Sequence, residues 1–305
     1  MKRPLHQRAA WPLLAICCFV LALCPAIARG QGEQPPFVVT PAQVVDRMLS
    51  MAKLGPDDVL IDLGSGDGRI VIEAAKRFGA RGLGIEMNAS LVETSRAAAR
   101  REGVAERARF ERGDALTTDL GPASVVTLYL SPELNERLLP RILAALRPGS
   151  RVVSHDFAIS NWAPDRTERL NVPEKNNGRG GESVVMLWIV PANAAGRWRG
   201  AIGHGAPRRA ISQGAASRAF EFSLGQQFQF LEGGLHGPTG ATLAFKASLS
   251  GDRITLQLPA QGAAAAGEVH ARIAADAMTG TWVAADGAVS APFEARRIAA
   301  RPDLY

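Results

Sequence analysis

The sequence predicts an α/β domain built on a seven-strand sheet, followed by a smaller all-β sandwich or barrel. Between residues 59 and 157, short apolar runs alternate with segments of helical periodicity, which indicates a parallel sheet with helices on both faces. From residue 197 onward, apolar and polar residues alternate in short segments separated by glycine turns, which is typical of antiparallel strands. We therefore expect a Rossmann-like, doubly wound domain at 37–191 and an all-β domain at 197–299.

Residues 1–28 have the three parts of a secretory signal peptide. Basic residues precede an apolar run at 9–23, and an A-x-A cleavage pattern follows at 26–28. The sequence thus predicts export, either to the periplasm or out of the cell. The alternative is a membrane anchor that is not cleaved, because the apolar run is nearly long enough to span a bilayer.

The three cysteines all lie within this signal peptide, so the mature chain would contain none. Their loss would exclude disulfides, thiolate metal sites and thiol nucleophiles. The formal net charge of the whole chain is +6, and the basic residues are scattered instead of forming a stripe with interleaved aromatic residues. This pattern argues against a nucleic-acid surface.

A polar linker at 29–36 leads to the first predicted helix. Thr40 is expected at its N-cap and Pro41 at its first helical position, because both residue types are preferred there. Apolar residues at helical spacing then extend the helix to residue 52. We expect this helix to cover one side of a ligand cleft.

The turn after the first strand, 59–63, is rich in glycine. Gly64, Gly66 and Gly68 leave the backbone open to close approach, so a ligand is expected to lie there, at the carboxyl end of the strand. The spacing G-x-G-x-G, preceded by Asp62, departs from the G-x-G-x-x-G of dinucleotide sites. A nucleoside-bearing cofactor that is not a nicotinamide dinucleotide is the expected ligand.

The other elements of the first domain follow in the same alternation. Glycine or proline stands directly after most of the predicted helices and ends them. The expected helices are 67–78, 90–102 and 132–146, and the expected strands are 81–86, 108–112, 125–130, 151–157, 166–172 and 183–190, the last two joined by a glycine-rich loop at 175–181.

Acidic residues stand at the ends of the second and third strands. Glu86 ends the second strand, and a carboxylate there can accept hydrogen bonds from two vicinal hydroxyl groups at once. Asp114 follows the third strand, either as a ligand-binding residue or as a turn aspartate. Because the carboxyl ends of parallel strands meet at one edge of a sheet, both acids are expected beside the glycine turn.

The segment D-L-G-S-G-D-G-R resembles the first motif of class I S-adenosylmethionine-dependent methyltransferases. Within that class, the sequence resembles a branch of seven-strand lysine methyltransferases whose eukaryotic members modify mitochondrial membrane carriers or an ATP synthase subunit. The resemblance covers 37–190 and is carried by F-x-x-T-P at 37–41, D-L-G-S-G-D-G-R-I-V at 62–71, E-M-N-x-x-L-V-x-x-S-R at 86–96, V-V at 125–126, R-V-V at 151–153 and N-W-x-P-D at 161–165.

The resemblance implies S-adenosylmethionine as the cofactor and assigns roles to matching residues. Asp62 and the glycines would hold the methionine part, Glu86 the ribose hydroxyl groups, and Asp114 the adenine amino group. It also implies that the last two strands are antiparallel. The implied cofactor-binding residues are Thr40, Asp62, Gly64, Ser65, Gly66, Gly68, Glu86, Met87, Asp114 and Ala115.

The methyl acceptor is expected where the fourth and fifth strands end. Segment 129–132 lacks the N-P-P-Y or D-P-P-Y motif of enzymes that methylate amide or ring nitrogens, so those acceptors are disfavoured. Tyr129 is a candidate for the acceptor pocket, or it packs beside the strand end. Trp162 either walls this pocket or belongs to the core. The eukaryotic relatives differ in segment 129–132 and lack the tail found here.

Methyl transfer needs a neutral nucleophile in line with the sulfonium, so positioning supplies most of the catalysis. A lysine acceptor has to lose its proton, which a desolvating pocket or a nearby carboxylate would favour. Asp156, in S-H-D-F at 154–157, is the candidate for that task. The alternative is that His155 and Asp156 are structural residues.

The all-β domain shows no cluster of metal-ligating residues and no nucleophile beside a base. It is expected either to bind a partner, substrate or envelope component or to stabilise the protein. We expect no metal in the molecule.

Three functions compete at this point. The first is a methyltransferase that acts on an amine, with a protein lysine as the implied acceptor. The second is a secreted binding protein that retains the methyltransferase fold, with the β module binding a partner. The third is a methyltransferase for a small-molecule amine. The intact Asp62, Glu86 and Asp114 favour an enzyme, whereas the signal peptide favours the binding protein, because S-adenosylmethionine is made in the cytosol.

Overall fold

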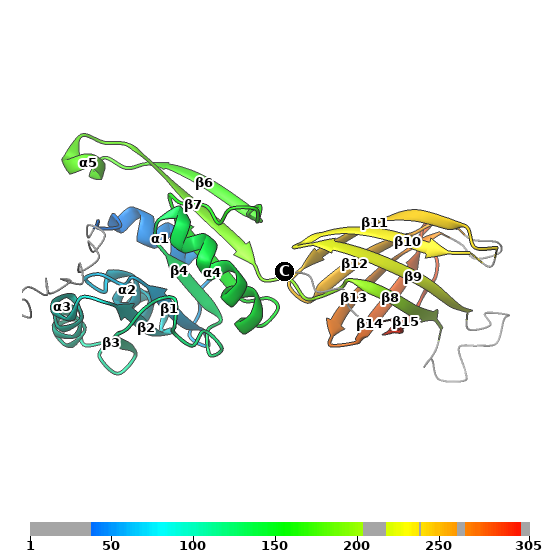
Figure 1. Ribbon diagram of the computed structural model, residues 1–305, viewed down its shortest axis with the longest axis horizontal. Coiled ribbons are helices and arrows are strands. Elements are labelled where there is room, and N and C mark those ends of the chain that lie inside the picture. Colours follow the sequence, from blue (N-terminus) through cyan, green and yellow to red (C-terminus); the bar gives the residue numbers. More distant parts are fainter. Residues whose placement is uncertain (1–37, 204–217, 238, 261–265, 300–305) are drawn as a thin grey trace, which may run out of the picture. The chain divides into compact units, whose positions relative to one another are not determined.

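The computed structural model describes residues 38–203, 218–237, 239–260 and 266–299. These residues form a seven-strand sheet with its helices and, later in the chain, a closed β-barrel (Figure 1). The predicted signal peptide at 1–28 and the predicted linker at 29–36 lie outside the described residues. Within the described part of the chain, no helix is long and apolar enough to cross a membrane.

The strands of the sheet have the order β3-β2-β1-β4-β5-β7-β6. The first five in this order are parallel, whereas β7 runs antiparallel to both of its neighbours. The order reverses at β1, and ligands bind at such reversals, outside the carboxyl ends of the strands. The strands are β1 (Val59–Leu63), β2 (Arg81–Glu86), β3 (Ala108–Arg112), β4 (Val125–Leu128), β5 (Arg151–His155), β6 (Arg166–Asn171) and β7 (Glu182–Ile189).

Helices cover both faces of this sheet. One apolar cluster joins one face to α1, α2 and α3, and a second cluster joins the other face to α4. Neighbouring residues of β1 divide between them, since Leu60 belongs to the first cluster and Ile61 to the second. The predicted doubly wound fold is thereby confirmed. The helices are α1 (Ala42–Met51), α2 (Arg69–Phe78), α3 (Ala89–Arg101), α4 (Pro132–Ala145) and α5 (Lys175–Gly178).

Two local predictions were wrong. Pro41 occupies the N-cap of α1 and no side chain caps that helix, so Thr40 is not the N-cap residue. The reason is that the Thr40 hydroxyl group contacts His155 instead. The glycine-rich connection before β7 contains the short helix α5, which the sequence did not predict.

Trp162 belongs to the apolar core. It is 1% exposed, and its ring packs against Trp188 and Phe228, with centroids 6.1 and 5.7 Å away. Its indole nitrogen donates a hydrogen bond to Gln229 Oε1 at 2.9 Å. The role in the acceptor pocket that the sequence left open for Trp162 is therefore not the one observed.

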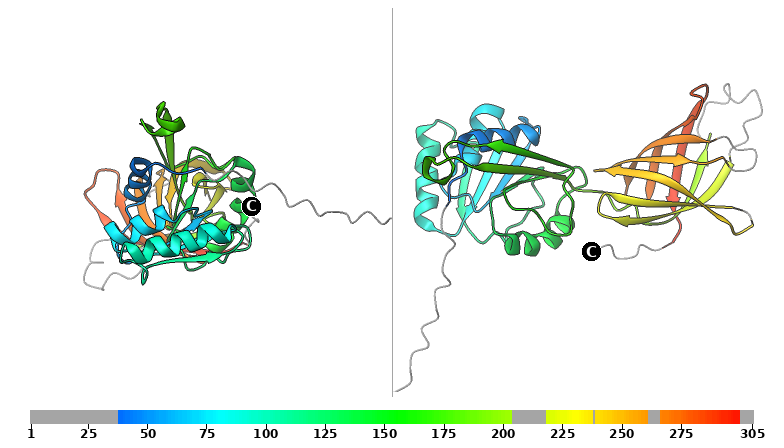
Figure 2. Two further views of the ribbon diagram at one scale, coloured as in Figure 1. Left: turned by 90° about the vertical axis from the view of Figure 1, so that its left-hand side faces the viewer. Right: turned by 90° about the horizontal axis from the view of Figure 1, so that it is seen from above.

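In the described residues, the last third of the chain forms a closed barrel of eight antiparallel strands (Figure 2). Its interior is filled by side chains, and Trp198, Phe222 and Phe293 are almost completely buried. The expected sandwich or barrel is thus a barrel with a packed core. Its strands are β8 (Gly196–Ile202), β9 (Arg218–Gln227), β10 (Phe230–His236), β11 (Thr242–Ser250), β12 (Arg253–Leu258), β13 (Gly267–Ala274), β14 (Ala277–Ala284) and β15 (Ser290–Arg297).

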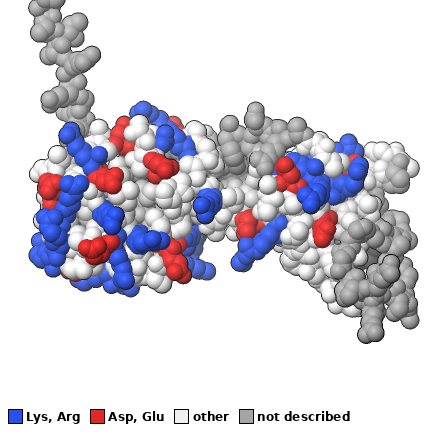
Figure 3. Space-filling model, turned by 90° about the horizontal axis from the view of Figure 1, so that it is seen from below, with Lys and Arg blue, Asp and Glu red and all other residues white. Residues whose placement is uncertain are grey.

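Charged side chains of both signs share the molecular surface. On the face shown in Figure 3, acidic groups lie between the basic ones, and the basic groups form several separate patches. The ion pairs Lys76–Glu102, Arg77–Asp46 and Arg199–Glu221 are examples of this mixing. Such pairs at the surface contribute little to stability.

Candidate cofactor and acceptor site

Three glycines shape the loop after β1. Gly64, Gly66 and Gly68 have positive φ angles of 78°, 54° and 83°, a conformation that residues with a Cβ rarely adopt. Space is restricted as well, since a Cβ added at Gly68 would lie 2.7 Å from the Phe110 ring and 2.8 Å from Ser95 Cβ. The loop therefore presents its backbone, and the N-terminus of α2, to a ligand that lies against it.

Glu86 lies beside this loop at the end of β2. Its Oε2 atom accepts a hydrogen bond from Gly66 N at 3.0 Å, and its Oε1 atom accepts one from Asn88 N at 2.9 Å. Ser95 of α3 supports the same loop, since its Oγ donates to the Gly66 carbonyl at 3.0 Å and to the Leu91 carbonyl at 2.8 Å. Both carboxylate oxygens of Glu86 are thereby held in place next to the glycines.

Asp62 lies near the carboxyl end of β1 and is 2% exposed. Thr127 on the neighbouring strand β4 donates its hydroxyl group to Asp62 Oδ1 at 2.7 Å, because the strand register pairs these two residues. Burial raises the pKa of the Asp62 carboxyl to about 7, and the charges of Asp67 and Glu86 act in the same direction. The carboxyl group therefore titrates near neutral pH.

Three further predicted residues follow β2 and β3. Asp114 Oδ1 accepts a hydrogen bond from Leu116 N at 2.8 Å, which is the turn role that the sequence left open. Met87 is 55% exposed, and Ala115 packs against the apolar cluster on the α4 face of the sheet. The carboxyl ends of the two strands thus hold all three residues, and their contacts with a cofactor stay predictions.

Thr40 connects the start of α1 to two other parts of the site. Its carbonyl accepts a hydrogen bond from Arg69 Nη1 at 3.0 Å, and Arg69 also pairs with Asp67 of the glycine loop. Its hydroxyl oxygen lies 3.3 Å from His155 Nδ1, at the end of β5. Thr40 is therefore a buried link between the glycine loop and the end of β5.

Tyr129 and His155 pack against each other where β4 and β5 end. Their ring centroids are 4.0 Å apart, and Tyr129 also stacks on Phe157 at 6.0 Å. His155 is fully buried, with its Nε2 atom 3.0 Å from Ser183 Oγ. Burial lowers the pKa of His155 to about 4, so its ring is neutral at pH 7. Tyr129 shows the packing role, and its role in an acceptor pocket stays a prediction.

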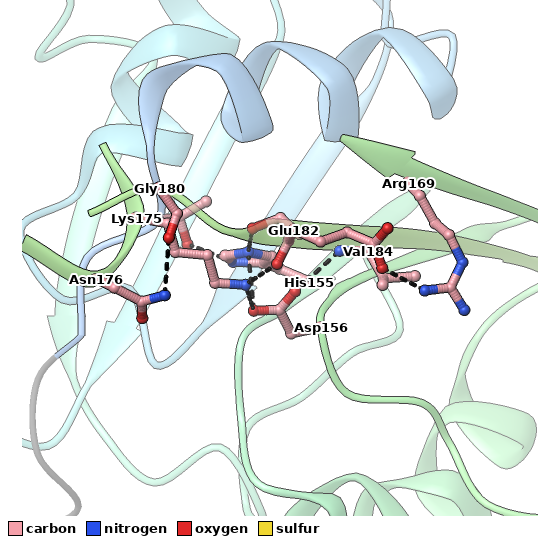
Figure 4. A network of polar contacts seen from close by, with 10 residues as sticks. His155, Asp156, Arg169, Lys175, Asn176, Gly180, Glu182 and Val184 are labelled. Carbon is pink, nitrogen blue, oxygen red and sulfur yellow. Dashed lines mark hydrogen bonds and ion pairs between the residues drawn. The ribbon is translucent and has the colours of Figure 1, made fainter. Parts of the chain in front are cut away.

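Asp156 takes part in a polar network directly after β5 (Figure 4). Its Oδ1 atom accepts a hydrogen bond from Val184 N at 2.9 Å, and its Oδ2 atom lies 2.6 Å from Lys175 Nζ. His155 Nε2 is 3.4 Å from the same Oδ2 atom, and Lys175 also donates to the Glu182 carbonyl. The predicted catalytic carboxylate is thus paired with an ammonium group of the same chain.

The sequence did not predict roles for Thr127, Ser95 or Lys175. Thr127 is a polar residue in an apolar strand, and that contrast is a signal that could have marked it. Ser95 lies within the motif at 86–96, but its contact with the glycine loop depends on how α3 packs. Lys175 carries no such signal, because its partner depends on how the connection between β6 and β7 folds back.

Across the described ranges, no group of three or more His, Cys, Asp or Glu residues could hold a metal ion.

Known proteins similar to this chain match the sheet domain. The ANTKMT methyltransferase domain matches residues 62–166. A protein-lysine N-methyltransferase of Saccharolobus islandicus (strain REY15A) is 44% identical over 156 residues, which are 51% of this chain and 93% of that relative. The chain belongs to this family of class I S-adenosylmethionine-dependent methyltransferases. It is therefore an enzyme of the branch that includes the lysine N-methyltransferases named for adenine nucleotide translocase and for an ATP synthase subunit.

Other matches to this methyltransferase also cover about half of the chain. The adenine nucleotide translocase lysine N-methyltransferase of Mus musculus is 36% identical over 161 residues, which are 52% of this chain and 69% of that protein. A crystal structure of an RNA methyltransferase from Salinibacter ruber, in complex with S-adenosyl-L-homocysteine, is 48% identical. It covers 50% of this chain and 93% of its own, with a TM-score of 0.45.

The methyltransferase binds S-adenosylmethionine, and the residues at the sheet edge fit this cofactor. The glycine loop offers backbone without side chains, and Glu86 presents a fixed carboxylate. Ser65 Oγ is buried and has no hydrogen-bond partner in the described part of the chain. A buried hydroxyl group of this kind normally finds a partner, and a polar group of the cofactor would supply one.

Proposed function

We propose that this methyltransferase transfers the methyl group of S-adenosylmethionine to the side-chain amine of a protein lysine. The observation that carries the proposal is that Asp156, at the end of β5, holds a primary ammonium group, that of Lys175. The relatives from Saccharolobus islandicus and Mus musculus support it, since both names specify lysine N-methylation.

The acceptor nitrogen is protonated in water at neutral pH and has to lose a proton before it can attack. When bound, S-adenosylmethionine supplies an electrophilic methyl group. In the proposed reaction, Asp156 Oδ2 would accept the proton that the lysine nitrogen gives up, which would leave a neutral nitrogen able to take up this methyl group. His155 is neutral beside Asp156, so it adds no positive charge that would repel the incoming ammonium. Tyr129 and Thr40 hold the His155 ring in place.

A labelling experiment tests the acceptor class. The purified protein is incubated with methyl-labelled S-adenosylmethionine and, in separate reactions, with poly-L-lysine, total RNA or small-molecule amines. We expect label in poly-L-lysine. Glu86→Ala should reduce this labelling by about tenfold or more, because it removes the carboxylate that accepts a hydrogen bond from Gly66 N and so organises the glycine loop.

The matched control is Glu111→Ala, which removes an exposed carboxylate from β3 and should keep full activity. The RNA reaction tests the kind of acceptor for which the Salinibacter ruber enzyme is named. Label in RNA alone, or in none of the acceptors, would contradict the proposal.

A further inference from the structure

Lys175 reaches from the connection between β6 and β7 back to the end of β5. Its Nζ atom lies 2.6 Å from Asp156 Oδ2 and also donates to the Glu182 carbonyl (Figure 4). The side chains of Lys175 and Asp156 are only 22% and 17% exposed, so neighbouring groups cover most of the pair. The side-chain carboxylate of Glu182 pairs with Arg169, and only the backbone carbonyl of Glu182 contacts the Lys175 ammonium group.

A series of contacts connects this ammonium group to the glycine loop after β1. Leu130 packs closely on that loop, since a Cβ added at Gly64 would be 2.8 Å from Leu130 Cδ2. The neighbour of Leu130, Tyr129, packs on His155, and His155 Nε2 lies 3.4 Å from Asp156 Oδ2. A continuous set of contacts therefore joins the glycine loop to the carboxylate that holds Lys175.

We propose that Asp156 Oδ2 and the Glu182 carbonyl form the binding site for the acceptor's primary ammonium group, and that Lys175 occupies this ammonium site until an acceptor lysine displaces it. The inference rests on the proposed function, because it takes the acceptor to be a lysine. It makes Lys175 an internal competitor and the connection between β6 and β7 the element that moves when the acceptor binds.

The ammonium site is held by contacts that do not involve Lys175. Asp156 Oδ1 accepts a hydrogen bond from Val184 N at 2.9 Å, and Asp156 N donates to the Val184 carbonyl at 2.7 Å. The first bond fixes the carboxylate of Asp156 to β7, and the second fixes its backbone. The site should therefore keep its shape when the Lys175 side chain withdraws.

The element that carries Lys175 is suited to withdraw. The helix α5 has four residues and no side-chain cap, and Gly178 at its end and Gly180 beyond it have positive φ angles of 81° and 78°. Removing Lys175 alone would leave a largely buried carboxylate without a counter-charge, which is costly. An acceptor lysine restores the lost charge, so exchange of one ammonium group for another avoids this cost.

Binding of a small lysine analogue tests the inference without requiring turnover. Nα-acetyl-L-lysine amide is titrated calorimetrically into the full chain saturated with S-adenosylhomocysteine. Lys175→Ala should lower the dissociation constant by about tenfold or more, because the competing ammonium is gone. Lys76→Ala is the matched control, since Lys76 forms a similar ion pair with Glu102 at another surface, and it should bind as the unmodified protein does.

A second substitution shows whether the gain depends on Asp156. Asp156→Asn removes the charge but keeps an oxygen for the Val184 N–H group, and asparagine tolerates the φ angle of 59° at this position. In Lys175→Ala, the added Asp156→Asn change should abolish the gain in affinity. If circular dichroism shows that Lys175→Ala is unfolded, Lys175→Gln takes its place. Glutamine removes the charge but keeps a hydrogen-bond donor for the Glu182 carbonyl.

The outcomes separate this inference from the proposed function. An unchanged dissociation constant in Lys175→Ala, a gain that survives Asp156→Asn, or no binding of the analogue to any variant overturns the inference. Methylation of poly-L-lysine without any effect of Lys175→Ala supports the lysine methyltransferase and rejects the internal competitor. Binding of the analogue that depends on Asp156, without methylation, supports the ammonium site and rejects the proposed acceptor.

Discussion

At the scale of single residues, the buried Asp62 carboxyl couples the stability of the sheet domain to pH. Its pKa is about 7 in the folded protein, against an ordinary value of 3.8. Between these two pH values the folded protein binds this proton more strongly than the unfolded chain does. The contribution of Asp62 to the free energy of unfolding is therefore fully present below pH 3.8 and is lost as the pH rises to about 7. The loss has an upper limit of about 4 kcal/mol.

Asp62→Asn should remove this dependence, because the amide carries no charge at either end of the pH range. The difference in unfolding free energy between the variant and the unmodified protein should shift in favour of the variant by about 2–3 kcal/mol when the pH is raised from 5 to 8. Urea unfolding at the two pH values measures the difference. Asp286→Asn, at an exposed turn of the barrel, is the control and should show no such change. An Asp62→Asn difference that is equal at both pH values would refute the coupling.

Residue types and spacing were enough to predict Asp62 and Glu86 as a pair at the edge of the sheet. The partner of Asp62 could not be predicted in the same way. Thr127 contacts Asp62 because β4 lies beside β1 in a particular register, and no local pattern states which strands are neighbours. Lys175 was missed for a similar reason, since its contact joins two segments that only the closing of the sheet brings together.

At the scale of elements, Gly68 decides whether the cofactor loop can pass into α2. Gly68→Ala would force an alanine into a φ angle of 83° and place its Cβ against Phe110 and Ser95. We expect a loss of about 2–4 kcal/mol in unfolding free energy, from conformational strain and overpacking together. Urea unfolding measures it.

Gly103 supplies the matched control for this change. It follows α3 with a φ angle of 71°, and nothing lies within 4 Å of the position where a Cβ would be added. Gly103→Ala should therefore show the conformational cost alone, about 1–2 kcal/mol. Equal losses of unfolding free energy in the two variants would mean that contact of the added Cβ with Phe110 and Ser95 does not contribute.

The elements of the sheet domain were predicted well where periodicity is strong and poorly where it is short. Helices α2, α3 and α4 follow from apolar spacing and their glycine or proline ends. Helix α5 has only four residues in a glycine-rich segment, so it offers no period to detect. The N-cap of α1 was mispredicted because local preference favoured Thr40, whereas its hydroxyl group contacts His155, far away in the sequence.

At the scale of the whole molecule, the all-β domain shows what an alternating pattern of apolar and polar residues can and cannot predict. The alternating pattern identifies its strands, and their buried residues form one apolar cluster. A sandwich and a barrel share that pattern, and they differ in whether the first and last strands pair. Here β8 pairs with β15 as well as with β9, which closes the ring.

We propose that residues 1–28 direct this enzyme out of the cytosol, on the strength of their basic, apolar and A-x-A segments. Mass spectrometry of protein from the exported fraction should then show a chain that begins at Arg29. Leu14→Arg should retain the precursor in the cytosol, because it places a charge in the apolar run. Leu243→Arg, on the barrel surface, is the matched control and should be exported normally. An intact Met1 in the exported protein would argue for an anchor that is not cleaved.

The pairing of β8 with β15 also sets an order for folding during synthesis. All strands of the described sheet have been made once Ile189 leaves the ribosome, whereas the barrel cannot close before Arg297 has been made. During synthesis, the strands of the sheet can therefore pair with one another while β8 still lacks its partner β15. Until then the apolar face of β8 and its unpaired backbone edge are open to the wrong partners. Slow synthesis of the last third of the chain would prolong that exposure.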